Sequence, residues 1–441
     1  MADESASAAV ATPSRPVVVE EDGWDRIGRA LVRVAPADLS IRLLWLLLLA
    51  TLLTRLLWLD RPPNALIFDE KYYVNAARMI AGIPPSPDIY QDKPLGLDPN
   101  LEHPPLAKVI TAGSIRLLGD NAYGWRIPSV LFGTLAVWLV YRVGSRLAGP
   151  SAGLLAATLL TLDNLFFVHG RIFTLDISML ALMLLGFDLY LRGRPTLAGV
   201  AFALAALCKL PGAFGLVALG LFEVLRLLRA EDRRQGLRLA VRPLVRLGLT
   251  FGIVFLLLLW LLDRLWVGYG QPFEHLQHIV TYAQLLRRQA PSGVESTAWQ
   301  WLWNDVAIPY LKVEQQVKAG DTVLENRPVV LFLGAMNPFV LALWPFALAI
   351  SAHAWWKREP GSDAGALVLA WFAAVYAPFV AGSLIGQRIS YLFYFLPVLP
   401  SIVVGGSLFL LRPGIPGVVR WVYLAAVLLG FYGYFPFKPV P

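Results

Sequence analysis

The sequence predicts an all-α, polytopic membrane protein with about eleven transmembrane helices and two large extracytoplasmic loops. Its 441 residues are 57% hydrophobic and only 15% charged, and the mean hydropathy is +0.59. Soluble domains contain roughly 45–50% apolar residues, so this composition is typical of an integral membrane protein. The apolar residues form repeated runs of membrane-spanning length, and arginine clusters between those runs indicate how the chain is oriented.

The N-terminal segment 1–38 is predicted to be a disordered cytoplasmic tail. It is rich in Ala, Ser, Pro and Glu and contains no long apolar stretch. The first apolar run begins near Ile41, and the basic residues around its start are Arg26, Arg29, Arg33 and Arg42. By the positive-inside rule the N-terminus is cytoplasmic, and no cleavable signal peptide is expected. The first span therefore ends near Asp60, outside the cytoplasm.

Residues 60–124 form the first predicted extracytoplasmic loop, because this stretch is polar, Pro-rich and too long for a tight turn. Six more apolar runs follow, at 125–147, 151–168, 172–191, 195–209, 211–229 and 247–266. The arginines between them fall on the same side as the N-terminus: Arg142, Arg146, Arg192, Arg194 and the group from Arg226 to Arg246. We group residues 39–266 as an N-terminal catalytic transmembrane module.

The second predicted extracytoplasmic loop covers residues 267–328. Its aromatic cluster, suited to lying along the membrane surface, contains Trp299, Trp301, Trp303 and Tyr310. A folded cap without chemistry is the alternative interpretation of this loop. Four further runs, at 329–352, 364–382, 389–411 and 418–437, make residues 329–441 a set of C-terminal transmembrane helices, with the C-terminus outside.

The net charge of +8 does not indicate a nucleic-acid partner. The basic residues form short clusters between apolar runs, where membrane orientation explains them, so nucleic-acid binding is excluded. The single cysteine, Cys208, lies in an apolar run, cannot form an intrachain disulfide, and is expected to pack as a small hydrophobic residue.

The stretch Phe68-Asp69-Glu70-Lys71-Tyr72-Tyr73 follows the first span and contains the two candidate catalytic residues, Asp69 and Glu70. Burial and mutual repulsion would separate the protonation of two adjacent acids, which suits proton abstraction by one of them. We predict Asp69 as the base. The alternative is an ordinary solvated acid pair, since paired acids mark functional sites only statistically.

A second stretch on the same loop, Glu102-His103-Pro104-Pro105-Leu106-Ala107-Lys108, supplies three candidates for acceptor binding or loop organisation. These are Glu102, His103 and Lys108. The two prolines restrict the backbone, so His103 and Lys108 can be held in fixed directions. The alternative is a helix start with Pro in its first turn and a solvated histidine.

Further charged residues fall at predicted outer ends of spans, where ionisable groups are functional candidates. Arginine can hold phosphate oxygens through a bidentate fork. The donor or phosphate-binding candidates are Arg126, Arg55, Arg171, Lys209 and Arg388, and the acceptor or loop candidates Asp163 and Asp176 join those above. We expect Arg126 to contact the donor and Arg55 to serve the acid pair. Snorkelling or a structural ion pair is the alternative for any one of them.

No spacing such as His-x-x-x-His or Asp-x-Asp, which would hold a metal ion firmly, is evident. The Arg and Lys side chains can supply positive charge instead, so the site is predicted to be independent of metal and to need no cofactor.

These motifs, in this order, resemble the protein O-mannosyltransferase family of C-type glycosyltransferases. The resemblance rests first on Thr54-Arg55-Leu56, Phe68-Asp69-Glu70, His103-Pro104-Pro105-Leu106-Ala107-Lys108, and Trp125-Arg126-Ile127-Pro128-Ser129 with Phe132-Gly133. It continues through Leu162-Asp163-Asn164, Gly170-Arg171-Ile172, Leu175-Asp176, Cys208-Lys209-Leu210-Pro211-Gly212 and Gly334-Ala335-Met336-Asn337-Pro338. It covers residues 40–340 well and the last hundred more weakly.

The resemblance implies the eleven-span C-type fold, with the active site at the outer face of the cell membrane. It also implies a polyprenyl-phosphate mannose donor and Ser or Thr hydroxyls of exported polypeptides as acceptors. In that interpretation Asp69 is the base of an inverting transfer, Glu70 is its neighbour at the acceptor site, and Arg55 and Arg126 are donor or structural contacts. Membrane lipids, the export machinery and a second copy of the chain are the further candidate partners.

Two features limit the resemblance. The loop 267–328 is too short for the β-trefoil domain of eukaryotic members, which points to a bacterial or archaeal form. The related aminoarabinose transferases typically have Lys where this chain has His103, so we predict a protein acceptor, with a lipid or cell-envelope glycan acceptor as the alternative. A lipid or solute transporter is a remote alternative, because secondary transporters usually show paired halves with interrupted helices at the bilayer midplane.

Overall fold

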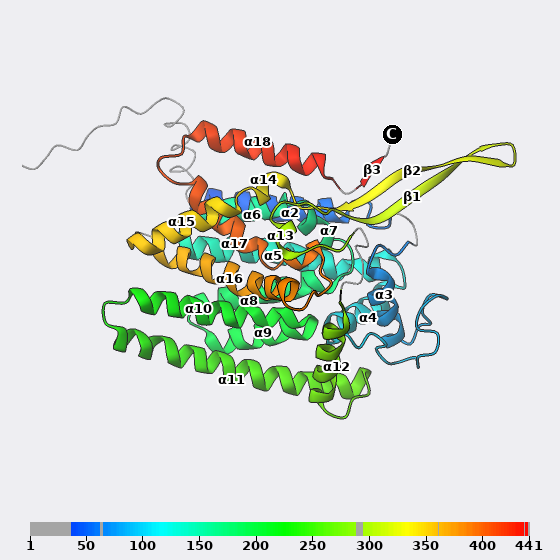
Figure 1. Ribbon diagram of the computed structural model, residues 1–441, viewed down its shortest axis with the longest axis horizontal. Coiled ribbons are helices and arrows are strands. Elements are labelled where there is room, and N and C mark those ends of the chain that lie inside the picture. The colour runs from blue at the N-terminus through cyan, green and yellow to red at the C-terminus, as the bar shows by residue number, and fades with distance from the viewer. Residues whose placement is uncertain (1–36, 62–64, 288–293, 360, 436, 440–441) are drawn as a thin grey trace, which may run out of the picture.

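The computed structural model is a bundle of helices that lie roughly side by side, with a β-hairpin projecting from one end (Figure 1). It describes residues 37–61, 65–287, 294–359, 361–435 and 437–439. The predicted tail 1–38 therefore lies almost entirely outside the described residues. The N-terminal half of the bundle contains α2 (Ala37–Leu56), α5 (Ala122–Ala148), α6 (Pro150–Thr161), α8 (Leu175–Leu191), α9 (Pro195–Cys208), α10 (Phe214–Arg229) and α11 (Arg233–Trp266). The C-terminal half contains α15 (Trp344–Lys357), α16 (Ser362–Leu384), α17 (Leu399–Leu410) and α18 (Gly417–Gly433).

The chain is a multi-pass membrane protein. In the described part, six helical stretches are long and apolar enough to cross a membrane: Leu39–Leu56, Ala122–Ala148, Leu210–Arg229, Arg233–Trp266, Pro338–Lys357 and Ser362–Leu384. Shorter apolar helices accompany them, at Pro150–Thr161, Pro195–Cys208, Leu399–Leu410 and Gly417–Gly433. The total of eleven spans stays a prediction, because the shorter helices do not span a bilayer by length alone.

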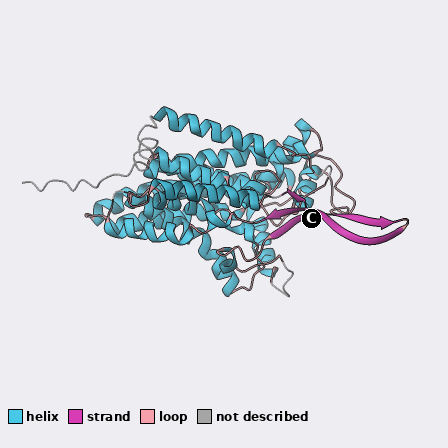
Figure 2. Cartoon of the chain, turned by 90° about the horizontal axis from the view of Figure 1, so that it is seen from above, coloured by secondary structure: helices cyan, strands magenta, loops and turns pink. Residues whose placement is uncertain are grey.

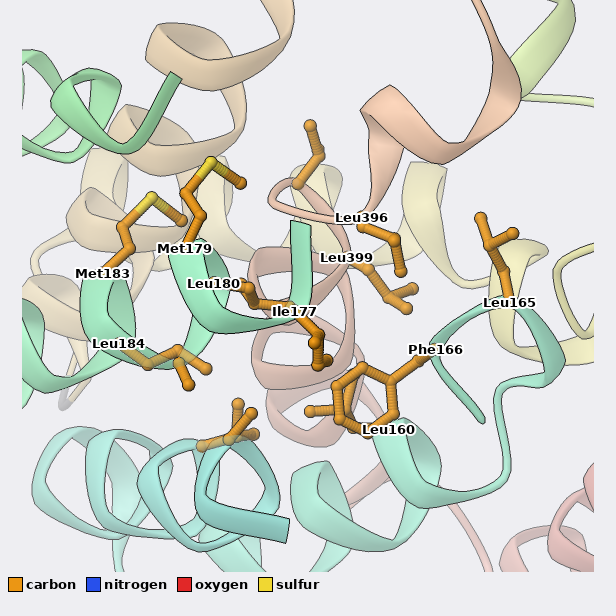
Figure 3. Packing of buried hydrophobic residues seen from close by; sticks show 14 of the residues in the cluster. Leu160, Leu165, Phe166, Ile177, Met179, Leu180, Met183, Leu184, Leu396 and Leu399 are labelled. Atoms are coloured by element: carbon orange, nitrogen blue, oxygen red, sulfur yellow. The ribbon is translucent and has the colours of Figure 1, made fainter. Parts of the chain in front are cut away.

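The centre of the bundle is packed with aliphatic and aromatic side chains from α6, α7 (Asn164–His169), α8 and α17. Figure 3 shows Leu160, Phe166, Leu180 and Leu399 meeting there, and all four are buried. Small residues bring helices closer still: a Cβ on Gly199 of α9 would lie 2.6 Å from the Leu247 carbonyl oxygen of α11. Close backbone approach of this kind is how helices associate where lipid removes the hydrophobic driving force.

Three of the predicted spans contain or end at non-helical backbone, and predicted site residues lie at two of these points. The run 151–168 divides at Asp163, whose carboxylate accepts a hydrogen bond from the Phe166 N–H and caps α7. The run 195–209 ends at Cys208, and the extended backbone of Lys209 leads into the short helix η1 (Leu210–Ala213). The run 389–411 begins with extended chain and η2 (Leu392–Phe395), so α17 covers only its second half.

The expectation of an all-α chain is wrong for the second loop. After α12 (Pro272–Leu285) and α13 (Ala298–Trp301), the chain forms β1 (Ile308–Ala319) and β2 (Thr322–Gly334), an antiparallel hairpin that β3 (Phe437–Pro439) extends at its base. The hairpin turns at Gly320, whose φ of 63° suits glycine. Residues 329–334 are therefore strand, and helix begins only with α14 (Pro338–Leu341), not at 329 as expected.

The first loop contains two helices of its own, α3 (Glu70–Ile80) and α4 (Leu106–Leu118), at the same end of the bundle as the hairpin (Figure 1). Asp98 and Lys108 form a buried ion pair with 2.6 Å between carboxylate and ammonium, which ties the irregular part of the loop to α4. This organisation gives the candidate residues of the loop fixed positions.

Candidate active site

Asp69 lies at the start of α3, half-buried, at the end of the bundle that carries both loops. Phe68 before it has a φ of 55°, which is unusual for a bulky residue. Packing holds this conformation, because the Phe68 ring lies 4.5 Å from that of Tyr310 and 5.7 Å from that of Phe393. Burial raises the pKa of Asp69 to about 7; the nearby charge of Lys209 opposes this rise.

Glu70, in contrast, is completely buried and fully engaged. Arg126 of α5 donates to both of its oxygens, with Nε–Oε1 at 2.8 Å and Nη2–Oε2 at 2.7 Å. The backbone N–H groups of Ile67 and Phe173 also donate to it, at 2.8 and 2.9 Å. Arg126 also donates from Nη1 to the Leu59 carbonyl and from Nη2 to the Ala65 carbonyl. The pair therefore joins α3 and α5 to the end of the first span.

Arg55 does not contact the acid pair, contrary to expectation. It is buried, donates from Nη1 to the Thr51 carbonyl, and lies 5.0 and 5.2 Å from the ring centres of Phe166 and Phe167. Of the two acids, Glu70 takes Arg126 of α5 as its partner instead. Arg171 donates to the carbonyls of Leu57 and Trp58 and so contacts the chain just after α2.

Lys209 and Asp176 form an ion pair beside Asp69, with 2.8 Å between Nζ and Oδ1. The ammonium group of Lys209 also lies 5.1 Å from the Phe393 ring centre and 4.9 Å from that of Tyr394. The interruption between α9 and η1 directs this side chain towards the site. Arg388 lies near His103 and Tyr394, since its charge acts on both of these side chains. The charge of Lys209 thus acts on both Asp69 and His103, and that of Arg388 acts on His103.

The stretch 102–108 serves mainly to organise the first loop. Pro105 precedes the first residue of α4, as the helix-start interpretation expects. Lys108 is buried, pairs with Asp98 and donates to the His103 carbonyl at 3.1 Å, while Glu102 accepts from Asn100. The ring of His103 lies 6.0 Å from that of Tyr73. Burial, together with the positive charges of Lys209 and Lys108, holds the pKa of His103 well below its usual value.

Asp163 has structural contacts. Besides capping α7, its carboxylate accepts a hydrogen bond from the Asn337 N–H at 2.9 Å. Asn337 in turn donates to the carbonyls of Leu162 and Val427. This network joins the α6–α7 turn to α14 and α18.

The structure brings Tyr310, which the sequence did not indicate as a site residue, into contact with His169. The Tyr310 hydroxyl lies 2.7 Å from His169 Nε2, and the Thr174 hydroxyl lies 2.7 Å from its Nδ1. Tyr310 comes from β1, whereas His169 ends α7. The position of His169 next to Gly170-Arg171 indicated that it could lie at the site. No local sequence pattern predicts its contact with a tyrosine 141 residues later in the chain.

A cavity of about 770 Å³ lies at the opposite end of the bundle, where α10 ends and α16 begins. Among the side chains that line it are Arg146, Glu223, Arg226 and Arg246. It includes none of the candidate site residues.

Residues 102–260 match the family model for dolichyl-phosphate-mannose-protein mannosyltransferase. A polyprenol-phosphate-mannose–protein mannosyltransferase from Mycolicibacterium smegmatis is 34% identical over 131 residues, which is 29% of this chain and only 24% of that relative. A protein of the same description from Mycobacterium tuberculosis is 25% identical over 445 residues, covering 84% of this chain and 82% of the relative.

Solved structures share the fold. A complex of S. cerevisiae protein O-mannosyltransferase Pmt1–Pmt2, bound to the sugar donor, matches with a TM-score of 0.68 and 13% identity, over 93% of this chain and 91% of that one. ArnT from Cupriavidus metallidurans matches with a TM-score of 0.55 and 17% identity, over 90% of this chain and 72% of that one.

The apolar bundle with its loop-borne, half-buried acid is that of a multi-pass membrane protein with the C-type glycosyltransferase fold. The chain is similar to protein O-mannosyltransferases: the family model matches residues 102–260, and the relative from Mycobacterium tuberculosis aligns with 84% of the chain at 25% identity.

Proposed function

We propose that this chain transfers a mannosyl group from polyprenyl phosphate to a Ser or Thr hydroxyl of a polypeptide, with inversion at the sugar C1. The observation that carries the proposal is the environment of Asp69. It is half-buried, has a pKa of about 7, and accepts no hydrogen bond from any side chain in the described part of the chain. A carboxylate with these properties can accept a proton near neutral pH.

In the proposed reaction the acceptor oxygen attacks C1 while Asp69 takes the hydroxyl proton. The new C1–O bond forms as the bond between C1 and the phosphate oxygen breaks. The electron pair of that bond leaves with polyprenyl phosphate, which needs no strong protonation because a phosphate monoester is already a stable anion. One base on the face opposite the leaving group gives inversion, as it does in inverting glycosidases.

Lys209 and Arg388 are our candidates for contacting the phosphate. The charge of Lys209 acts on Asp69 and that of Arg388 on His103, and the ion pair with Asp176 fixes the direction of Lys209. The growing negative charge on the leaving phosphate would be stabilised by such fixed cations. Arg126 is assigned to positioning Glu70, because four of its five N–H groups donate to Glu70 and to two carbonyls.

We further propose that the site faces the extracytoplasmic side, with the N-terminus in the cytoplasm. The arginine-rich ends of α5, α10 and α11 lie at the opposite end of the bundle from Asp69, as the positive-inside rule requires. Acceptors would then be exported polypeptides. The export machinery and a second copy remain predicted partners.

The experiment is a transfer assay with the purified full-length chain in detergent, polyprenyl-phosphate mannose, and a peptide that contains one threonine. Mass spectrometry should find one hexose on that threonine. A transporter would catalyse no transfer in detergent. The ArnT similarity supports the fold alone, so transfer to lipid or glycan acceptors but to no peptide would favour the alternative acceptor class.

A further inference from the structure

Strand β1 connects the site directly to the exterior of the bundle. Its register with β2 leaves Tyr310 as an extra residue, because Pro309 pairs with Leu333 and Leu311 already pairs with Phe332. Bulges of this kind redirect a side chain, and Tyr310 points to His169 and packs on Phe68. Gly334 makes room for it, since a Cβ there would lie 2.5 Å from the tyrosine ring. The start of β1 is therefore fixed beside Asp69.

Beyond Leu311, β1 is an open edge strand. The sheet order is β1-β2-β3, so β2 covers one edge of β1, and no strand of the described residues covers the other. In the described part of the chain, no backbone hydrogen bond links residues 308–319 to any segment other than β2. An uncovered edge is a row of unpaired N–H and C=O groups that can pair with another chain. From Leu311 to Ala319 this edge is about 30 Å long.

We propose that the acceptor polypeptide binds as an added β-strand along this free edge of β1. The inference rests on the proposed function and states how the acceptor is held. An extended chain paired with β1 lies about 4.8 Å from it, and its course leads past Tyr310 to Phe68 and Asp69. Main-chain pairing gives affinity without requiring a particular sequence. That suits an enzyme whose acceptors share only a hydroxyl.

The position of the hairpin favours this occupant over a second copy of the chain. Figures 1 and 2 show the hairpin projecting beyond the helices, and in Figure 1 β1 is the strand nearer α3. A strand docked there would run towards the start of β1, where Tyr310 packs on Phe68 next to Asp69. The first charged side chains along β1, Lys312 and Glu314, pair with one another at 2.8 Å, so they select neither acidic nor basic acceptors.

The first test uses single N-methylated peptides, because an N-methyl group removes one backbone donor. In a 12-residue acceptor with one threonine, each residue is N-methylated in turn and KM is measured with the full-length chain. On one side of the threonine, N-methylation at every second position should raise the acceptor KM. The rise should be roughly three- to tenfold, as expected for loss of one hydrogen bond. The positions between should change little, because their N–H groups point away from β1.

The second test shortens the hairpin. Replacing residues 316–326 by Asn-Gly leaves Gln315 opposite Arg327 and supplies a two-residue turn. The acceptor KM of the 12-residue peptide should rise, while the KM of a tripeptide acceptor and of the donor should not change. Asp321→Asn, at the tip of the intact hairpin, is the matched control and should leave all three values unchanged.

The outcomes are distinct. Transfer with equal sensitivity at every N-methylated position, or an unaltered KM after shortening, would overturn strand docking and leave the proposed function standing. If the shortened variant instead loses a dimer measured by light scattering while its KM stays the same, the edge serves a second copy and the inference is wrong. If the folded, intact chain transfers mannose to no peptide, both the proposed function and the strand-docking proposal are wrong.

Discussion

Asp69 and Glu70 are adjacent in the chain but have opposite surroundings. Glu70 accepts hydrogen bonds from Nε and Nη2 of Arg126 and from two backbone N–H groups. Asp69 is half-buried, and its pKa is raised to about 7. The helical start of α3 turns consecutive side chains in different directions, so one acid contributes to the structure and the other stays available for proton transfer.

We expect Asp69→Asn to lower the transfer rate by roughly 10²- to 10⁴-fold, the range associated with loss of a general base. The amide keeps the size of the side chain, so the thermal unfolding temperature should not fall. Initial rates and thermal unfolding of the purified variant check this. Near-normal turnover would refute Asp69 as the base.

The pH profile gives an independent check on the same residue. Because the base must be deprotonated, and its pKa is about 7, kcat/KM should rise as pH increases through 7 and level off above pH 8. The residual activity of Asp69→Asn should lack this rise. A wild-type profile that is flat between pH 5.5 and 8.5 would contradict the assignment.

At the scale of elements, the Arg126–Glu70 pair joins α5, α3 and the segment after α2. Arg126→Lys keeps the charge but loses the planar fork. We expect a clear fall in unfolding temperature, since each buried acceptor left unsatisfied costs about 1–3 kcal/mol. Raising the donor concentration should not restore the rate, whereas a role in donor binding would allow partial rescue. Arg233→Lys, an exposed change at the start of α11, is the control.

The interruption between α9 and η1 places Lys209 against Asp176 and the rings of Phe393 and Tyr394. Lys209→Ala should raise the donor KM at least about tenfold, the loss expected for a charge-assisted hydrogen bond. Asp176→Asn should share part of the defect, and the double variant should be no worse than Lys209→Ala, because the two act as a unit. Additive defects would show that they act separately.

At the scale of the whole molecule, orientation can be tested with introduced cysteines. The native Cys208 is buried, so background labelling should be low. In intact cells a membrane-impermeant maleimide should label Asp321→Cys at the hairpin tip and should not label Arg233→Cys until the cells are opened. The reverse pattern would place Asp69 on the cytoplasmic side.

The sequence by itself determined the membrane class, the two loops, the position of Asp69 after the first span and the family resemblance. Each of these depends on composition or on residues close together in the chain. Only the tertiary structure decided that Glu70 takes Arg126, 56 residues away, as its partner, whereas Arg55 packs against phenylalanines. It also decided that Tyr310 of β1 meets His169. Such pairings depend on how helices and strands pack, and a local sequence pattern does not record which distant side chain lies across the interface.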